Sequence, residues 1–253
     1  MNSEAENHFQ KDIEYHETIG DEYHSVVVDP RSYLNEMLFA PIAKTVKAGQ
    51  SMLDLGCGTG HMMLRFGQQF QTVTGVDHSP KMLGSARINC RNAGINAQFQ
   101  HQNIFDFLTQ NDRQYDLVSC VGCLHHLIPE TIPEVMKGIA NSLNSGGLAI
   151  MAEPIMVDPA DEPAEIIRWN QKAIGRLPQY STAIDEPDEA PIDPDLLLEA
   201  VAASGLQIAA QSRSWEILPK NMPPSILDRL AIRFFHWRYG SDGIVMAIAA
   251  RKS

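Results

Sequence analysis

Three glycines and one aspartate are the residues of this sequence whose types and spacing point most directly to chemistry. Gly56, Gly58 and Gly60 alternate in the stretch LDLGCGTG, and Asp77 ends the next apolar run, TVTGVD. Because glycine has no Cβ, a turn built from it lets a ligand lie directly against the main chain. An ionised carboxylate accepts hydrogen bonds through two oxygens and donates none, so it suits a pair of hydroxyl donors such as those of ribose. The combination predicts a nucleoside-binding site.

Other uses of a glycine-rich turn do not fit this sequence. A phosphate-binding loop ends in Gly-Lys-Ser or Gly-Lys-Thr, whereas Gly60 is followed by His61. The dinucleotide fingerprint has the spacing Gly-x-Gly-x-x-Gly, whereas the spacing here is Gly-x-Gly-x-Gly. A short-chain dehydrogenase would have Tyr-x-x-x-Lys, and none of the 6 tyrosines has a lysine four residues later. We therefore expect the turn to hold a nucleoside without a phosphate.

Possible catalytic bases follow two further apolar runs. His125 and His126 come after YDLVSCVG, and Glu153 lies near the end of LAIMAEP. An imidazole can act as a general base near neutral pH, and a carboxylate in a suitable position can do the same. Alternatively, one of the rings only satisfies backbone groups. His125, His126 and Glu153 are therefore candidate catalytic residues.

The 4 cysteines do not predict a metal site. Cys120 and Cys123 have the spacing of zinc ligands, but no second pair of Cys or His residues at a suitable distance completes a zinc set. Ordinary buried thiols are the simpler interpretation, and we expect no metal. So few cysteines in a chain of 253 residues are typical of a reducing compartment.

These residues lie among short apolar runs that alternate with helical patterns. Such alternation is typical of a parallel sheet that is covered by helices on both faces. Ligands bind such sheets at the carboxyl ends of the strands, which is where His125, His126 and Glu153 fall. The expected strands are SMLDLG, TVTGVD, AQFQHQN, YDLVSCVG, LAIMAEP, QIAAQSRSWEIL and GIVMAIAARK, and helices are expected at about 61–70, 80–93 and 129–143, near AEIIRWNQKAIG and in PDLLLEAVAASG.

Two helices are expected before the first strand. Tyr15, Ile19 and Tyr23 recur at steps of four, which places them on one face of a helix. The stretch RSYLNEMLFAPIAKTV predicts a second helix, with Pro41 as a break or kink.

The chain changes character after Glu153. Residues 153–199 hold 12 acidic and 3 basic residues, which predicts a solvated lid or a surface that steers a cationic substrate. Further on, Ile226, Leu230, Phe234 and Trp237 are spaced as one stripe of a helix. Packing is the simplest use of this stripe. It could also meet a partner chain or wall an apolar substrate pocket, and we favour the pocket over the partner.

Four stretches, taken together, resemble the consecutive motifs of one enzyme family. LDLGCGTG, GVDHSPKML, YDLVSCVGCLHHL and LNSGGLAIMAEP are similar in order and spacing to those of the class I S-adenosylmethionine-dependent methyltransferases, over about residues 50–153. The resemblance implies an α/β fold: a Rossmann-like, doubly wound, mostly parallel seven-stranded sheet with helices on both faces. We expect an N-terminal helical cap (1–48) and a methyltransferase domain (49–253) with a lid insertion after the fifth strand (154–190) and a helical insertion (219–240) between the last two strands.

The resemblance also implies which residues bind S-adenosylmethionine. The glycine turn would line the methionine part, Asp77 would bind the ribose, and Met82 would pack on the adenine. Asn103 stands where the family often has an aspartate that contacts the adenine amino group, and the Asn oxygen can still accept that bond. The complete expected set is Tyr15, Tyr23, Asp54, Gly56, Cys57, Gly58, Asp77, His78, Met82, Asn103, Ile104, Cys120 and Val121.

Charge and composition limit the partners. The formal net charge is -11, which argues against a nonspecific grip on nucleic acid or anionic lipid, although a local basic patch would be compatible with it. The polar N-terminus does not predict a signal peptide, and no apolar run reaches the length of a membrane span. We therefore expect a cytoplasmic monomer or homodimer that acts on a small molecule.

The expected reaction is methyl transfer from S-adenosylmethionine, releasing S-adenosylhomocysteine, to oxygen, nitrogen or carbon of a natural-product, quinone or lipid-like acceptor. Three alternatives stay open. The enzyme could use the sulfonium for other chemistry, such as cyclisation, decarboxylation or transfer of another group. It could bind a nucleoside without catalysis. It could also methylate a macromolecule, which the acidic charge disfavours for nucleic acid.

Overall fold

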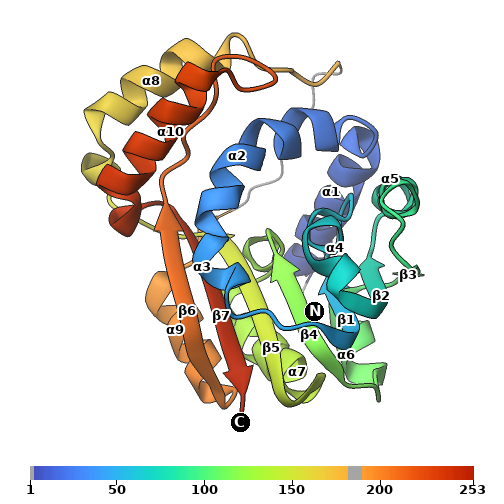
Figure 1. Ribbon diagram of the computed structural model, residues 1–253. Coiled ribbons are helices and arrows are strands. Elements are labelled where there is room, and N and C mark those ends of the chain that lie inside the picture. Colours follow the sequence, from blue (N-terminus) through green and yellow to red (C-terminus); the bar gives the residue numbers. More distant parts are fainter. Residues whose placement is uncertain (1–2, 182–189) are drawn as a thin grey trace.

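A seven-stranded sheet forms the centre of the computed structural model, which describes residues 3–181 and 190–253 (Figure 1). The strand order is β3-β2-β1-β4-β5-β7-β6. Strands β1 to β5 pair in parallel, and β7 runs antiparallel to both of its neighbours. The predicted mostly parallel, seven-stranded sheet is confirmed. The strands are β1 (Gly49–Leu55), β2 (Phe70–Asp77), β3 (Ala97–His101), β4 (Tyr115–Val121), β5 (Leu143–Pro154), β6 (Leu206–Ser214) and β7 (Val245–Lys252).

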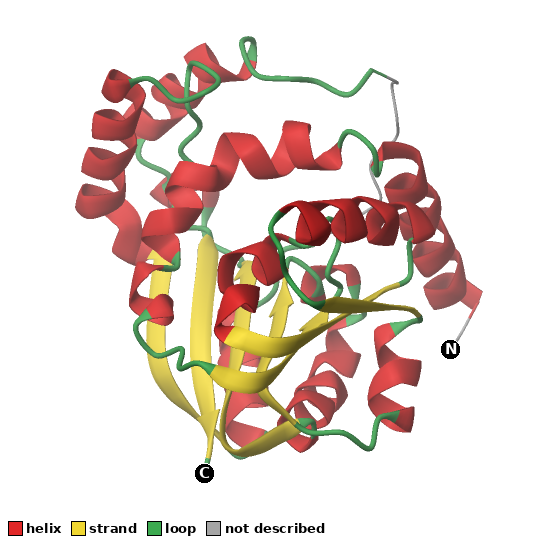
Figure 2. Cartoon of the chain, turned by 45° about the vertical axis from the view of Figure 1, so that its right-hand side comes forward, coloured by secondary structure: helices red, strands yellow, loops and turns green. Residues whose placement is uncertain are grey.

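Helices cover both faces of the sheet, as Figure 2 shows. One apolar cluster joins one face to α6 (Ile104–Gln110), α7 (Ile132–Asn141) and α9 (Pro194–Ala203). A second cluster joins the other face to α3 (Ala40–Ala43), α4 (His61–Phe66) and α5 (Pro80–Asn92). Most positions of the central strands β1 and β4 are buried, because helices cover both of their faces.

The N-terminal segment lies across the carboxyl ends of the parallel strands (Figure 1). It consists of α1 (Ser3–Ile19), a short π-helix (His24–Val28) and α2 (Asp29–Leu38). The break between α2 and α3 falls at Phe39, and Pro41 lies in the first turn of α3, close to the predicted break. Tyr15 and Tyr23 were expected on one helix, which is wrong, because α1 ends at Ile19 and a turn separates it from Tyr23.

Two further helices pack on each other beyond the sheet. They are α8 (Ala164–Ile174), which follows β5, and α10 (Ile226–Tyr239), which precedes β7 (Figure 1). The rings of Trp169 and Phe235 meet at 5.7 Å, and Trp169 Nε1 donates to the carbonyl of Leu218. Part of the predicted lid, residues 182–189, lies outside the described residues. None of the helices in the described part of the chain is long and apolar enough to cross a membrane.

Candidate active site

The glycine turn follows β1 and leaves open space above its main chain. Gly56, Gly58 and Gly60 have φ values of +61°, +50° and +88°, a region that side chains rarely adopt. A Cβ on Gly56 would come within 2.5 Å of Cys123 Sγ, so this glycine is needed for packing. A Cβ on Gly58 would meet nothing within 4 Å. Gly58 therefore presents bare backbone to an open space.

Asp77 ties this turn to the end of β2. Its Oδ2 accepts a 2.8 Å hydrogen bond from the backbone nitrogen of Gly58, and its Oδ1 accepts one of 2.9 Å from that of Ser79. The side chain is buried, so these bonds fix its orientation. Each carboxylate oxygen has two lone pairs, and each can accept a further hydroxyl donor. The geometry is compatible with the predicted contact to ribose.

Asp54 lies beneath the turn, away from solvent. Its Oδ1 accepts a 2.6 Å hydrogen bond from the hydroxyl of Ser119 on the adjacent strand β4. Burial raises the pKa of Asp54 to about 7, and the nearby charge of Asp77 adds to this effect, while the bond from Ser119 opposes it. Asp54 therefore lies next to the turn, as expected, but as a buried support rather than as an exposed lining residue.

Glu153 and His125 form a hydrogen-bonded pair at the same edge of the sheet. His125 Nδ1 lies 2.7 Å from Glu153 Oε2. The other carboxylate oxygen accepts bonds of 3.1 Å from the backbone nitrogens of Cys123 and Leu124. The Glu153 side chain is fully buried, whereas that of His125 is 12% exposed. Of this pair, only His125 reaches solvent, and Glu153 fixes its position.

A group of rings lies beside this pair. His126 stacks on His125 with a centroid separation of 4.1 Å and an interplanar angle of 36°. The ring of His16, from α1, lies 5.2 Å from that of His126 and 6.0 Å from that of His78. The contacts of His16 with Tyr15 and Tyr23 complete the group. The structure thus brings the predicted tyrosines, His78 and His126 together around His16, which was not predicted as a site residue.

The remaining predicted residues lie around the turn, but several are covered by the protein itself. Met82, Ile104, Cys57 and Cys120 are buried, and burial raises the pKa of the Cys57 thiol. Asn103 caps helix α6 by accepting a bond from the backbone nitrogen of Phe105. Helix α6 itself was not predicted. A direct contact of these side chains with a cofactor remains a prediction.

Three residues of the N-terminal segment were not predicted as parts of the site: His16, Glu17 and His24. The His24 ring lies 2.9 Å from the Thr59 hydroxyl in the glycine turn, and Glu17 accepts bonds from the Ser79 hydroxyl and the Lys81 backbone nitrogen at the start of α5. His16, Gly20 and His24 recur at steps of four, which was the available signal. It was obscured because the chain turns between Gly20 and Glu22.

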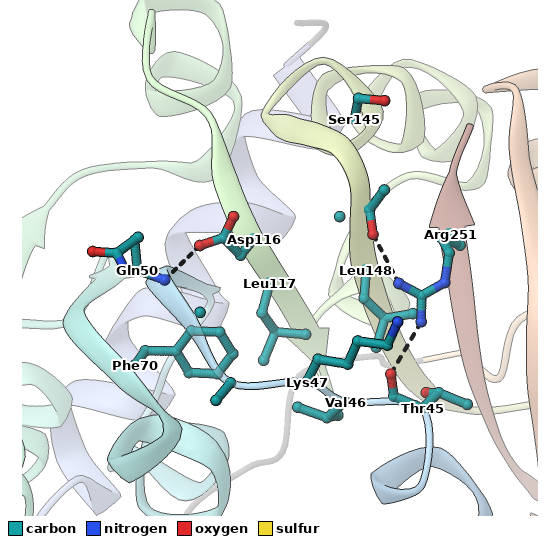
Figure 3. Close-up of a pocket in the computed structure, with 14 residues that line it drawn as sticks. Thr45, Val46, Lys47, Gln50, Phe70, Asp116, Leu117, Ser145, Leu148 and Arg251 are labelled. Atoms are coloured by element: carbon teal, nitrogen blue, oxygen red, sulfur yellow. Dashed lines mark hydrogen bonds between the residues drawn. The ribbon is translucent and has the colours of Figure 1, made fainter.

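A cavity of about 290 Å³ lies at the opposite, amino edge of the sheet (Figure 3). Its charged side chains Asp116 and Arg251 already have protein partners. Asp116 accepts from the backbone nitrogens of Gln50 and Ser51, and Arg251 donates to the carbonyls of Thr45 and Gly146. These bonds hold strand ends together, so we assign the active site to the carboxyl edge.

Comparison with known proteins identifies a matching domain family. Residues 52–147 match the methyltransferase domain family. Ubiquinone biosynthesis O-methyltransferase from Aeromonas salmonicida is 32% identical over 99 residues, which are 39% of this chain and 41% of that one. The chain thus matches less than half the length of this curated relative.

Two solved structures share the fold over a longer stretch. The complex of DhpI with SAH superposes with a TM-score of 0.60 at 18% identity, covering 100% of this chain and 99% of that one. The [4+2]-cyclase SpnF has a TM-score of 0.56 at 18% identity, covering 87% of this chain and 79% of that one. At such low identity the likeness concerns the fold alone. With the matched family, the sheet order and the glycine turn in agreement, residues 52–147 form a methyltransferase domain of the class I S-adenosylmethionine-dependent type.

Proposed function

We propose that the chain transfers a methyl group from S-adenosylmethionine to a hydroxyl oxygen of a small, largely apolar organic acceptor. The observation that carries this proposal is the 2.7 Å contact between His125 Nδ1 and Glu153 Oε2 at the edge of the sheet that bears the glycine turn. A hydroxyl must lose its proton as it attacks, so an oriented base next to the cofactor site favours oxygen as the attacking atom.

The residues of the turn fit the cofactor. Gly58 offers bare main chain, which supports a close approach of the ligand, and Asp77 has acceptor capacity for ribose hydroxyls. S-adenosylmethionine, when bound, supplies a methyl group that a sulfonium already activates. The protein has to align the acceptor and keep water away. The N-terminal segment, which contacts the turn through His24 and the start of α5 through Glu17, supports such a cover.

The hydrogen bond to Glu153 determines which nitrogen of the His125 ring carries a proton. A carboxylate only accepts hydrogen bonds, so Nδ1 of His125 carries the proton of their shared bond. The other ring nitrogen, Nε2, is then the atom that can take the proton of the acceptor hydroxyl. Glu153 itself is a positioning residue, because its carboxylate is buried and both of its oxygens accept bonds from the protein.

The relatives support the choice of acceptor class. The relative from Aeromonas salmonicida is named as an O-methyltransferase of ubiquinone biosynthesis, so a phenolic or quinol-type hydroxyl is the first acceptor to test. The fold is also shared with a [4+2]-cyclase, so cyclisation is the second candidate reaction. That the chain acts as a monomer or homodimer on this small molecule remains part of the proposal.

Product analysis tests the proposal. The protein is incubated with S-adenosylmethionine and, separately, a catechol, a simple phenol, a primary amine and a thiol, and the products are read by mass spectrometry. We expect S-adenosylhomocysteine together with a methylated catechol or phenol. His125→Gln should lower kcat by about 10²- to 10⁴-fold, the usual contribution of a general base, and His126→Gln should lower it much less. Methylation of the amine or thiol alone, or full activity of His125→Gln, would contradict a hydroxyl acceptor with this base.

A further inference from the structure

Helix α10 carries an exposed apolar stripe. Leu227, Leu230, Phe234 and Trp237 follow steps of three and four residues, and Ile226 extends the stripe at the start of the helix. Their exposed fractions are 75%, 59%, 54%, 77% and, for Ile226, 78%. Single exposed apolar residues are ordinary, but five on one side of a helix form a patch that calls for a partner.

The stripe is not the face by which α10 joins the protein. That face consists of Asp228, Ile232, Phe235 and Tyr239, which are buried or partly buried against α2, α8 and the segment after β6. At 100° per residue the two sets lie on opposite sides of the helix. The simplest use expected of this stripe, packing, is therefore wrong, because the packed face is the other one. The expected pocket wall is not supported either, because the stripe faces away from α2 and α8. The stripe points outward.

Basic residues border the stripe in a chain that is otherwise acidic. Arg229 and Arg233 flank it on one side and Arg238 on the other, all three exposed. Figure 1 shows α8 and α10 side by side at the periphery. Residues 219–240 contain four Lys and Arg residues and a single acid, Asp228, which is buried, whereas the whole chain has a net charge of -11.

We propose that the outer face of α10 docks on the surface of an anionic lipid bilayer. Ile, Leu, Phe and Trp on one side of a helix with Arg at its borders are the composition of a helix that lies in the plane of a membrane interface. Arginine stems can lie along the apolar layer while their guanidinium groups reach phosphate. An anionic surface attracts this basic face and repels the acidic remainder of the molecule, which fixes the orientation.

Charge also disfavours a second copy of this chain as the occupant. In a two-fold dimer the same patch meets itself, so the arginines around the stripe would approach their own copies. Like charges that face each other across an interface oppose binding. A lipid surface avoids this repulsion, because its phosphates have the opposite sign.

Vesicle sedimentation tests the proposal. The full chain is mixed with vesicles of phosphatidylcholine alone, or of equal parts phosphatidylcholine and phosphatidylglycerol, and the bound fraction is measured at low and high salt. We expect binding to the anionic vesicles, weakened by salt and accompanied by a blue shift of tryptophan fluorescence that Trp237→Phe removes. Binding to phosphatidylcholine alone should be at least about tenfold weaker, because the loss of attraction to anionic lipid acts on several cations at once.

Two pairs of variants separate the contributions of the apolar stripe and of the charges. Leu230→Ser with Phe234→Ser should weaken binding at least about tenfold, whereas Ile88→Ser, at an equally exposed apolar position on α5, should not. Arg229→Glu with Arg233→Glu should weaken binding at least about tenfold, whereas Arg87→Glu with Arg91→Glu, which has the same spacing on α5, should not.

Three results would overturn the proposal. The first is no binding to the anionic vesicles, and the second is equal binding to neutral and anionic vesicles. The third is a dimer in analytical ultracentrifugation that the Leu230→Ser, Phe234→Ser variant dissociates, with no vesicle binding by the parent chain. That result would assign the stripe to a second copy.

Discussion

The backbone nitrogen of Gly58 donates a 2.8 Å hydrogen bond to Oδ2 of Asp77, which joins the glycine turn after β1 to the carboxyl end of β2. One residue thus has two tasks. The carboxylate holds the turn in shape, and in the proposed function it also accepts the ribose hydroxyls. Loss of the side chain should therefore affect both the fold and the affinity for the cofactor, and these two effects can be separated by a matched control.

The first prediction concerns Asp77→Ala. We expect the affinity for S-adenosylhomocysteine to fall by about 1–3 kcal/mol, the usual loss when a hydrogen bond to a charged group is removed. Asp116→Ala is the control, because Asp116 also accepts from two backbone nitrogens, those of Gln50 and Ser51, but at the opposite edge of the sheet. Calorimetric titration should show weaker binding only for Asp77→Ala, while urea unfolding should show destabilisation of both variants. Equal affinity of the two variants would remove Asp77 from the site.

The second prediction concerns Gly58→Ala. A side chain at φ +50° costs about 1–2 kcal/mol in stability, and the added methyl group would occupy the space that the cofactor is proposed to fill. Gly94→Ala is the control, since Gly94 has φ +69° and, like Gly58, no atom within 4 Å of an added Cβ, but it lies after α5. We expect similar destabilisation of the two variants in urea and loss of cofactor affinity only for Gly58→Ala. If both retain the affinity of the parent, the open space at Gly58 is not the ligand site.

The third prediction concerns Glu153→Gln. The amide oxygen can still accept from Cys123 and Leu124, but the amide nitrogen then faces His125 and donates to Nδ1. The ring must then carry its proton on Nε2, which can no longer act as a base. We expect kcat to fall about 10²-fold or more, with little change in the KM for S-adenosylmethionine or in the KM for the acceptor.

Glu216→Gln is the control for this change, because it disrupts another carboxylate pair, the 2.6 Å contact with Arg31, without touching His125. Its kcat should stay close to that of the parent. A Glu153→Gln variant with unchanged kcat would show that the orientation of His125 does not limit the reaction.

The sequence was informative wherever a local pattern determines the backbone. Alternating glycines predict a turn at positive φ, and Asp77 ends a strand next to it in the sheet, so this part of the site could be predicted. Helix α6 was not predicted, because its seven residues are too few to show a clear helical period. The site residues His16, Glu17 and His24 depend on a turn that brings α1 back onto α5, and that packing is not local.

Helix α10 shows a different limit of sequence reasoning. Its residues offer two apolar faces, one with Ile232 and Phe235 and one with Leu230 and Phe234, and periodicity alone cannot say which is buried. Packing against α8 determines which face is buried. It depends on contacts between segments far apart in the sequence, such as that of Trp169 with Phe235.

The fourth prediction concerns the pH dependence of stability and Asp54. Its pKa is raised from 3.8 to about 7 by burial, so the folded state holds a proton that the unfolded state releases between these values. Stability from this group is therefore full below about pH 4 and falls as pH rises to about 7, by about 4 kcal/mol at most. Asp54→Asn cannot ionise, and Ser119 can turn to accept from its amide. In urea unfolding, the free energy of unfolding of this variant relative to the parent should be higher at pH 8 than at pH 5. A constant difference would mean that Asp54 titrates normally.

The fifth prediction concerns His61, the first residue of α4. Its contribution to stability changes with pH in the opposite direction to that of Asp54. Burial, with smaller contributions from Arg65 and His24, lowers the pKa of His61 from 6.5 to about 4, and its buried Nε2 has no hydrogen-bond partner. Its contribution to stability is full above about pH 6.5 and is lost as pH falls to about 4, by about 3 kcal/mol at most, because the unfolded state takes up the proton first. His61→Phe fills the same space without titrating and leaves no polar atom unpaired. We expect this variant to be at least as stable as the parent at pH 8. As the pH falls to 4.5, its free energy of unfolding should rise relative to that of the parent. Equal loss of stability by the two proteins over this range would show that His61 is accessible to protons in the folded state.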